Sequence, residues 1–300
     1  MHVVIAGASG FLGTSLTEEL VRRGHRVTAL VRRAAAGPAE SSWDPAAGRY
    51  DRDVVESADA VVNLAGSPTL GNPHSAAWAR TLRESRVRST DVLARAVAQS
   101  ARRPALLAGN GISWYGDHGA AELTEHSDSR GHALLTRVTR EWQAATLPAV
   151  EAGARVCVLR TAPVQDQRSA PLRQLRTLFR AGLGGRLGSG RQHMAMISLR
   201  DWVGAVAHLV EDDSVSGPVN LCCSRPPTNA EFTEALARRL GRRAPFAVPA
   251  PLLRLAAGPM APELLGSLNV RPAALEASGY VVRDPDVTAV LASALSSGRG

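Results

Sequence analysis

Three glycines spaced three residues apart lie near the start of this chain of 300 residues. The run Gly7–Gly13 follows the apolar run His2–Ala6 and precedes a helical pattern. Between a strand and a helix, this spacing gives a tight turn, a close approach to a pyrophosphate and close helix–sheet packing. A structural glycine turn is the alternative, but strand, spacing and helix together favour a dinucleotide at the helix N-terminus. The residues expected at this site are Gly7, Ala8, Ser9, Gly10, Phe11, Leu12 and Gly13.

Two adjacent arginines, Arg32 and Arg33, follow the second expected strand, Arg26–Val31. An acidic residue at this position would hold the ribose hydroxyls of NAD, whereas a guanidinium can bind the 2′-phosphate of NADP. The strand end carries no Asp or Glu, so the sequence favours NADPH as the cofactor. The alternative is a pair of exposed arginines in an arginine-rich chain.

Small residues end three further expected strands, Ala60–Leu64, Ala105–Gly109 and Arg155–Arg160. The carboxyl ends of parallel strands share the edge of the sheet where ligands bind. The small residues after the first of these strands would let the chain pass beneath the adenosine. The backbone of Ala162–Val164, after the third, would contact the nicotinamide carboxamide. The cofactor contacts expected from these strand ends are Leu64, Ala65, Gly66, Gly109, Asn110, Ala162, Pro163 and Val164.

The alternation of short apolar runs with helical patterns predicts an α/β fold, a Rossmann-type doubly wound parallel sheet. After residue 163 the pattern changes to a basic amphipathic stretch and a glycine cluster at 182–190, which is typical of a mobile cover. We therefore expect a smaller, mainly C-terminal substrate lobe. The dinucleotide-binding domain should cover residues 1–164 with 197–224 returning to it, and the substrate lobe and lid 165–196 and 225–300.

The composition excludes several other classes of protein. Apolar residues make up 45% of the chain, but no run is long enough to span a bilayer and no basic leader precedes Val3, so we expect a cytoplasmic protein without a membrane partner. The net charge of +8 comes from scattered arginines, which does not indicate nucleic acid. The three cysteines lack metal-ligand spacing, so no metal site is expected. The oligomeric state stays open.

Lysine is absent from the sequence: all 35 basic residues are arginines. Together with the glycine run, several motifs resemble the short-chain dehydrogenase/reductase superfamily, in its extended and atypical branch, and specifically the sugar-epimerase-like group. The resemblance spans nearly the whole chain. The motifs that carry it are Asn63–Gly66, Ser85–Val87, Tyr115–Asp117, Arg160–Thr161, Gly182–Gln192, Arg200–Asp201 and Thr228–Phe232.

Enzymes of this superfamily usually transfer protons with a Ser or Thr, a Tyr and a Lys. By spacing, the resemblance places these positions at Asn110, near Leu134 and at Val138. The set is therefore lost, while the cofactor motif is kept. This combination resembles the ketoreductases that lack the set and act on angucyclinones. The resemblance implies NADPH-dependent reduction of a carbonyl of an aromatic polyketide in antibiotic biosynthesis.

Another group must then stabilise the developing alkoxide. One hypothesis is assistance by the substrate, through a neighbouring phenol that hydrogen-bonds the same oxygen. Protein donors are the other, and Ser113, Tyr115 and His118 follow the strand that ends at Gly109. The alternatives are that Ser113 only stabilises its own turn, that Tyr115 is a packed aromatic side chain, and that His118 is a surface histidine.

An aromatic substrate would need an apolar environment beside the glycine-rich cover. Met and Trp side chains are more often simply part of a core. Other functions stay open too: a non-catalytic NADP(H)-binding regulator, or a nucleotide-sugar epimerase-like enzyme, against which the missing Tyr and Lys argue. The residues expected to contact substrate are Ser113, Tyr115, Phe179, Leu183, Met194, Met196 and Trp202.

Overall fold

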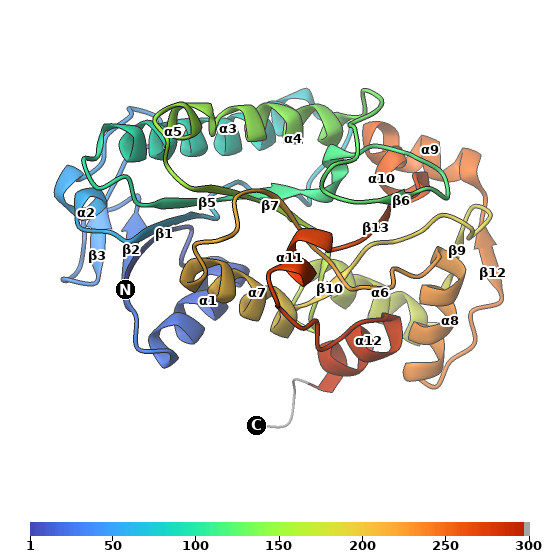
Figure 1. Ribbon diagram of the computed structural model, residues 1–300. Coiled ribbons are helices and arrows are strands. Elements are labelled where there is room, and N and C mark those ends of the chain that lie inside the picture. The colour runs from blue at the N-terminus through green and yellow to red at the C-terminus, as the bar shows by residue number, and fades with distance from the viewer. Residues whose placement is uncertain (297–300) are drawn as a thin grey trace. The chain divides into compact units, whose positions relative to one another are not determined.

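The computed structural model describes residues 1–296, which form two compact units (Figure 1). The first unit consists of Met1–Asn110, Val138–Leu159 and Val203–Val219, and the second of the other described residues. Residues 111–137 belong to the second unit, although the sequence pattern assigns them to the dinucleotide-binding domain. The segment that returns to the first unit is 203–219, shorter than the expected 197–224.

A seven-stranded sheet in the order β11-β7-β5-β4-β1-β2-β3 provides the strands of the first unit. β1 pairs in parallel with both β2 and β4, so the chain reverses its direction of winding beside β1. This topology confirms the Rossmann-type α/β fold. The strands are β1 (His2–Ala6), β2 (Arg26–Val31), β3 (Glu40–Ser42), β4 (Ala60–Asn63), β5 (Ala105–Gly111), β7 (Val156–Thr161) and β11 (Gly217–Leu221).

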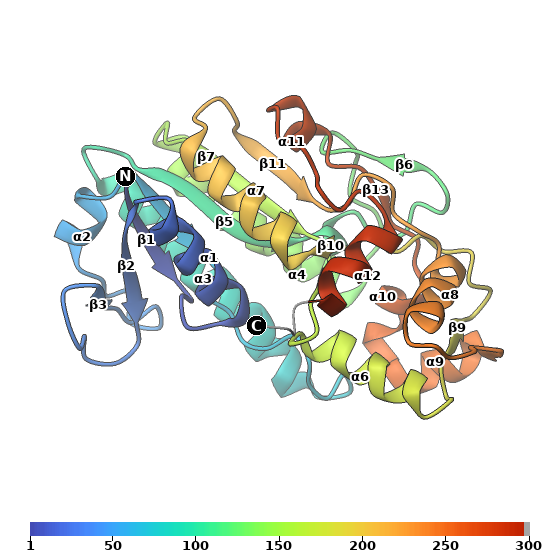
Figure 2. The ribbon, with the colours of Figure 1, turned by 90° about the horizontal axis from the view of Figure 1, so that it is seen from below.

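Helices cover both faces of the sheet in the first unit, with α1 and α7 on one face and α3 and α5 on the other (Figures 1 and 2). In α1, Leu16 and Leu20 are four residues apart and both fully buried, as an amphipathic helix requires. The helices that include residues of this unit are α1 (Phe11–Arg22), α2 (Arg52–Glu56), α3 (Ala76–Gln99), α4 (Leu134–Ala144), α5 (Leu147–Glu151) and α7 (Leu199–Glu211).

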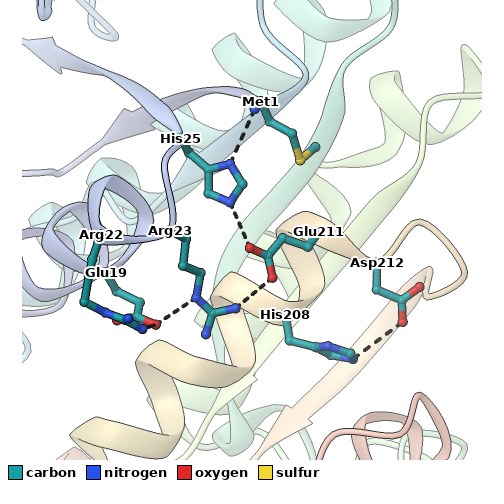
Figure 3. A network of polar contacts seen from close by, with 8 residues as sticks. All are labelled: Met1, Glu19, Arg22, Arg23, His25, His208, Glu211 and Asp212. Atoms are coloured by element: carbon teal, nitrogen blue, oxygen red, sulfur yellow. Dashed lines mark hydrogen bonds and ion pairs between the residues drawn. The ribbon is translucent and has the colours of Figure 1, made fainter.

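Ion pairs join α1 to α7 in the network of Figure 3. Glu211, the last residue of α7, accepts a hydrogen bond from Arg23 Nη1 at 2.7 Å and lies 2.8 Å from His25 Nε2. Arg23 also pairs with Glu19 of α1 at 2.7 Å. Because His25 immediately precedes β2, the network lies at the amino edge of the sheet, away from the strand ends where a dinucleotide would bind.

The second unit has its own core of helices and short strands. Phe179, Met196 and Phe232 are nearly fully buried in it, and α8 begins with a capping box between Thr228 and Glu231. No helix within residues 1–296 is long and apolar enough to cross a membrane. The elements are η1 (Ile112–Trp114), β6 (Glu122–Leu123), β8 (Val164–Gln165), α6 (Ala170–Arg180), β9 (Gly185–Leu187), β10 (Ile197–Ser198), α8 (Asn229–Arg239), β12 (Phe246–Val248), α9 (Ala250–Ala257), η2 (Gly258–Met260), α10 (Ala261–Leu265), β13 (Asn269–Val270), α11 (Ala273–Ala277) and α12 (Val287–Ser296).

Candidate functional site

The glycine turn after β1 is packed so closely that two of its glycines leave no room for a side chain. Gly7 has a φ of 83°, and a Cβ on it would lie 2.7 Å from the carbonyl carbon of Leu64. A Cβ on Gly13 would lie only 2.1 Å from the carbonyl oxygen of Gly7. The turn is therefore held against the segment that follows β4, and α1 is held against the turn.

The N-terminus of α1 opens from this turn. Gly10 is the N-cap residue, no side chain caps the helix, and the first turn contains no acidic residue. Phe11 and Ser9 are exposed. Backbone N–H groups and the positive end of the helix dipole favour a phosphate at such a terminus. The residues present thus fit the diphosphate of a dinucleotide, as the sequence predicts.

The two arginines after β2 differ in their surroundings. Arg33 donates to both carboxylate oxygens of Glu40 in β3, at 2.7 and 2.6 Å. This bond, with a backbone N–H from Ala36, lowers the pKa of Glu40 to about 2. Arg32 is exposed, and no carboxylate within residues 1–296 pairs with it. Arg32 is therefore the arginine available for a 2′-phosphate, whereas the pairing of Arg33 with Glu40 could not be read from the sequence pattern.

The end of β4 is fixed by a buried polar cluster in the first unit. Asn63 donates through Nδ2 to Thr90 Oγ1 at 2.8 Å and accepts from the N–H of Ala65 at 3.0 Å. Trp142 Nε1 donates to the same Thr90 oxygen at 2.8 Å. A Cβ on Gly109 would lie 2.8 Å from the carbonyl oxygen of Asn63 and 3.2 Å from the Trp142 ring. The expected small residues therefore serve close packing at this edge.

Arg86 of α3 lies beside the same segment and is part of the sequence motif Ser85–Val87. A Cβ on Gly66 would lie 3.3 Å from Arg86 Cγ and 3.4 Å from its Cζ. Burial lowers the pKa of Arg86 to about 10, so the guanidinium remains charged at neutral pH. A positive charge thus lies beside Leu64–Gly66.

In the second unit, Tyr115 is fully buried and its hydroxyl is engaged. It donates to Asn220 Oδ1 at 2.7 Å and accepts from Arg160 Nη1 at 2.9 Å. Burial raises the pKa of Tyr115, although Arg160 opposes this shift. These contacts give Tyr115 a packing role in place of the donor role considered from the sequence. Sequence patterns did not indicate the partners, because they lie 45 and 105 residues away.

Ser113, the second candidate donor, has an acidic partner that the sequence analysis missed. Its Oγ donates to Glu263 Oε2 of α10 at 2.6 Å. Burial raises the pKa of Glu263, and the bond from Ser113 opposes this shift. His118 Nε2 lies 3.1 Å from the backbone oxygen of Tyr115, a contact within its own loop. Of the three candidates, Ser113 is the one whose side chain is hydrogen-bonded to a carboxyl group.

The apolar residues expected to contact substrate are mostly part of the core of the second unit. Phe179 and Met196 are 3% and 1% exposed within one buried cluster, and Met194 packs against that cluster. Trp202 is fully buried and donates through Nε1 to Thr161 Oγ1 at 3.2 Å. Leu183 is 65% exposed instead. The core alternative thus applies to four of these five residues, because their side chains pack against the lobe itself.

The remaining expected positions lie at strand ends. In the second unit, Ala162 is buried, Pro163 accepts from the N–H of Ile197, and Val164 begins β8. In the first unit, Asn110 Nδ2 donates to the backbone oxygen of Thr139 at 3.1 Å. The positions of the usual Tyr and Lys carry Leu134 and the buried Val138, so no titratable side chain stands at either.

Comparison with known proteins agrees with this geometry. A model of the NAD dependent epimerase/dehydratase family matches residues 3–222, more than half of the chain. The chain belongs to this family. A second model, described as a domain of unknown function (DUF1731), matches residues 248–294, which include α9 to α11 and most of α12. The glycine turn thus lies in the region matched by the epimerase/dehydratase family, whereas Glu263 lies in the region matched by the domain of unknown function.

Members of the family with similar sequences occur in bacteria and mammals. The epimerase family protein Mb2239 of Mycobacterium bovis is 40% identical over 93% of this chain and 92% of its own length. A crystal structure of human epimerase family protein SDR39U1 with NADPH has a TM-score of 0.88 and 31% identity, over 99% of this chain and 100% of the human chain. A Corynebacterium glutamicum structure named as a nucleoside-diphosphate sugar epimerase has a TM-score of 0.81 and 33% identity, over 98% of this chain and 58% of its own.

Proposed function

We propose that this protein is an NADPH-dependent oxidoreductase that reduces a ketone without the usual Tyr and Lys. The single observation that carries the proposal is the close-packed glycine turn at the uncapped start of α1, in a chain that contains no lysine. When bound, the cofactor supplies the hydride. The chain's own contribution is to hold the two reactants in position, which alone provides a large part of the rate of such a reaction.

NADPH is favoured over NADH by Arg32, and by the human family member crystallised with NADPH. We expect Arg32→Ser to lower the ratio of NADPH to NADH affinity about tenfold, because it removes a charged hydrogen bond to the 2′-phosphate. Arg33→Ser should change this affinity ratio less directly, because Arg33 pairs with Glu40 and the substitution breaks that ion pair. The double variant should bind both cofactors about equally. Fluorescence titration would measure the affinities, with Arg49→Ser, another exposed arginine paired with an acid, as the control.

The proton has two candidate sources in this proposal. The first is a phenol of the substrate beside the ketone, which would need no protein acid. The second is the Ser113–Glu263 pair: the Ser113 hydroxyl would give its proton to the alkoxide, and the protonated carboxyl of Glu263, whose pKa is raised by burial, would return a proton to the serine oxygen. The contacts of the Tyr115 hydroxyl with Arg160 and Asn220 favour these two sources over Tyr115.

The proposal is tested by measuring NADPH oxidation with angucyclinone and quinone-like ketones, each paired with an analogue that lacks the neighbouring phenol. Substrate assistance predicts that the analogue loses at least about 100-fold in kcat, which is the size of a general-acid contribution. The Glu263→Gln variant should then react normally. Analogues reduced at an unchanged rate, together with an inactive Glu263→Gln variant, would instead place the proton on the protein.

The aromatic polyketide substrate rests on the sequence resemblance alone, and the names of the relatives add no support for it. A second function deserves the same assay: a non-catalytic NADP(H)-binding regulator, favoured by apolar residues at the Tyr and Lys positions. Tight NADPH binding without turnover of any ketone would select the regulator. Interconversion of nucleotide sugars in the same preparation would select an epimerase.

A further inference from the structure

Arg86 has an environment that its position on a long helix does not explain. The side chain is partly buried in the first unit, between α3, the segment after β4, and Trp142 of α4. Its Cζ lies 5.2 Å from the centre of the Trp142 ring, a cation–π contact. Three other arginines of the same helix, Arg83, Arg88 and Arg95, instead pair with acids at the surface.

The hydrogen bonds of Arg86 leave its charge without a compensating anion. Nη1 donates to the backbone oxygen of Leu82 at 3.0 Å, and Nη2 to Thr69 Oγ1 at 3.1 Å. Both acceptors are neutral, and these bonds use two of the five N–H donors of a guanidinium. Within residues 1–296 no carboxylate forms an ion pair with Arg86. Burial of a cation is costly unless an anion accompanies it.

The location of this cation matches the edge of the glycine turn. Arg86 contacts Gly66 and Thr69, and Leu64 and Ala65 of the same segment pack against Gly7. A ligand held at the turn and extending over this segment would therefore bring an anionic group toward Arg86. All these residues belong to the first unit, so the surroundings of Arg86 lie within that unit.

We propose that Arg86 binds an oxyanion of the ligand that lies over Leu64–Thr69. Two sources share this chemistry: the phosphates of the cofactor, and an oxyanion or carboxylate of a second ligand. The proposal rests on the dinucleotide site proposed above. The planar guanidinium can donate two parallel hydrogen bonds to such a group. The chain contains no lysine, and Arg86 is a partly buried cation beside the segment that packs against the glycine turn.

The test is equilibrium binding, with no turnover required. The probes are NADPH, 2′-phospho-ADP-ribose, which keeps the diphosphate but lacks nicotinamide, and oxalate, added to the protein with and without NADPH. If the cofactor phosphates are the source, Arg86→Met should weaken both nucleotides about tenfold or more. If a second ligand is the source, nucleotide affinity should stay unchanged while thermal stabilisation by oxalate is lost.

Two further variants separate binding from folding. Arg88→Met changes an exposed arginine two residues away and should leave every affinity unchanged. Arg86→Lys keeps the charge without the planar fork and should show an intermediate loss. Nucleotide affinities and oxalate stabilisation that are all unchanged in Arg86→Met would overturn the proposal. A wild-type protein that fails to bind NADPH would contradict the dinucleotide site instead, and oxalate stabilisation of the ligand-free protein would still test Arg86.

Discussion

Gly13→Ala should weaken dinucleotide binding strongly. The added Cβ would lie 2.1 Å from the carbonyl oxygen of Gly7 and 2.7 Å from Ala8 Cα. Both contacts are with backbone, so either α1 or the turn has to move. Such overpacking lowers the free energy of unfolding by about 1–3 kcal/mol. We expect a Kd for NADPH raised at least about 100-fold, equivalent to the loss of about 2.7 kcal/mol, as measured by fluorescence titration.

Gly24→Ala is the matched control, because Gly24 lies just beyond the other end of α1. Its φ is 83°, and a Cβ there would meet no atom within 4 Å. The variant should therefore lose only about 1 kcal/mol of stability, the cost of a left-handed backbone at a non-glycine residue, and the glycine turn should be unchanged. Equal NADPH affinities for Gly13→Ala and Gly24→Ala would show that the glycine turn does not hold the cofactor.

Arg160→Met should cause the largest loss of stability in the second unit. Arg160 is 2% exposed, and its Nη1 donates to the Tyr115 hydroxyl at 2.9 Å. Its Cζ lies 3.6 Å from the centre of the Trp114 ring. Burial raises the pKa of Glu125, and the positive charge of Arg160 opposes this rise. Removal of one member of a buried charged network costs about 3 kcal/mol or more, which urea denaturation would measure.

The loss should grow as the pH rises. A carboxyl group with a raised pKa in the folded state contributes stability that is present below its unfolded pKa and lost as the pH rises through the folded value. Without the positive charge of Arg160, ionisation of the buried Glu125 would cost more free energy. The stability of the variant should therefore be closest to that of the wild type at acidic pH, where Glu125 is protonated. Tyr115→Phe removes only the hydroxyl and should cost less, about 1–2 kcal/mol. A pH-independent difference between wild type and Arg160→Met would argue against this coupling.

The parts of the protein that short-range rules determine were predictable from sequence. The glycine turn, the strand before it and the helix after it are neighbours in the chain, and the observed sheet confirms the expected fold. Loss of the Tyr and Lys positions was predictable too, since absence of lysine is a property of the composition.

The partners of the charged residues were not predictable, because tertiary packing selects them. Glu263 meets Ser113 across 150 residues, and Arg160 meets Tyr115 across 45. Periodicity shows which face of a helix is apolar, but not which buried polar group it will meet. For the same reason Phe179, Met196 and Trp202 were expected to contact substrate but contribute to the core.

In the proposed NADPH site, the pair formed by Arg33 and Glu40 would lie beside the adenine ribose. Because the pKa of Glu40 is about 2, this carboxylate keeps one charge state throughout the physiological range. A phosphate monoester changes charge near pH 6. On the proposed site, protonation of the ligand's own 2′-phosphate should therefore weaken the preference for NADPH as the pH falls from 8 to 5. Acidification would thereby shift the balance between the two nicotinamide cofactors without any proton binding to this pair.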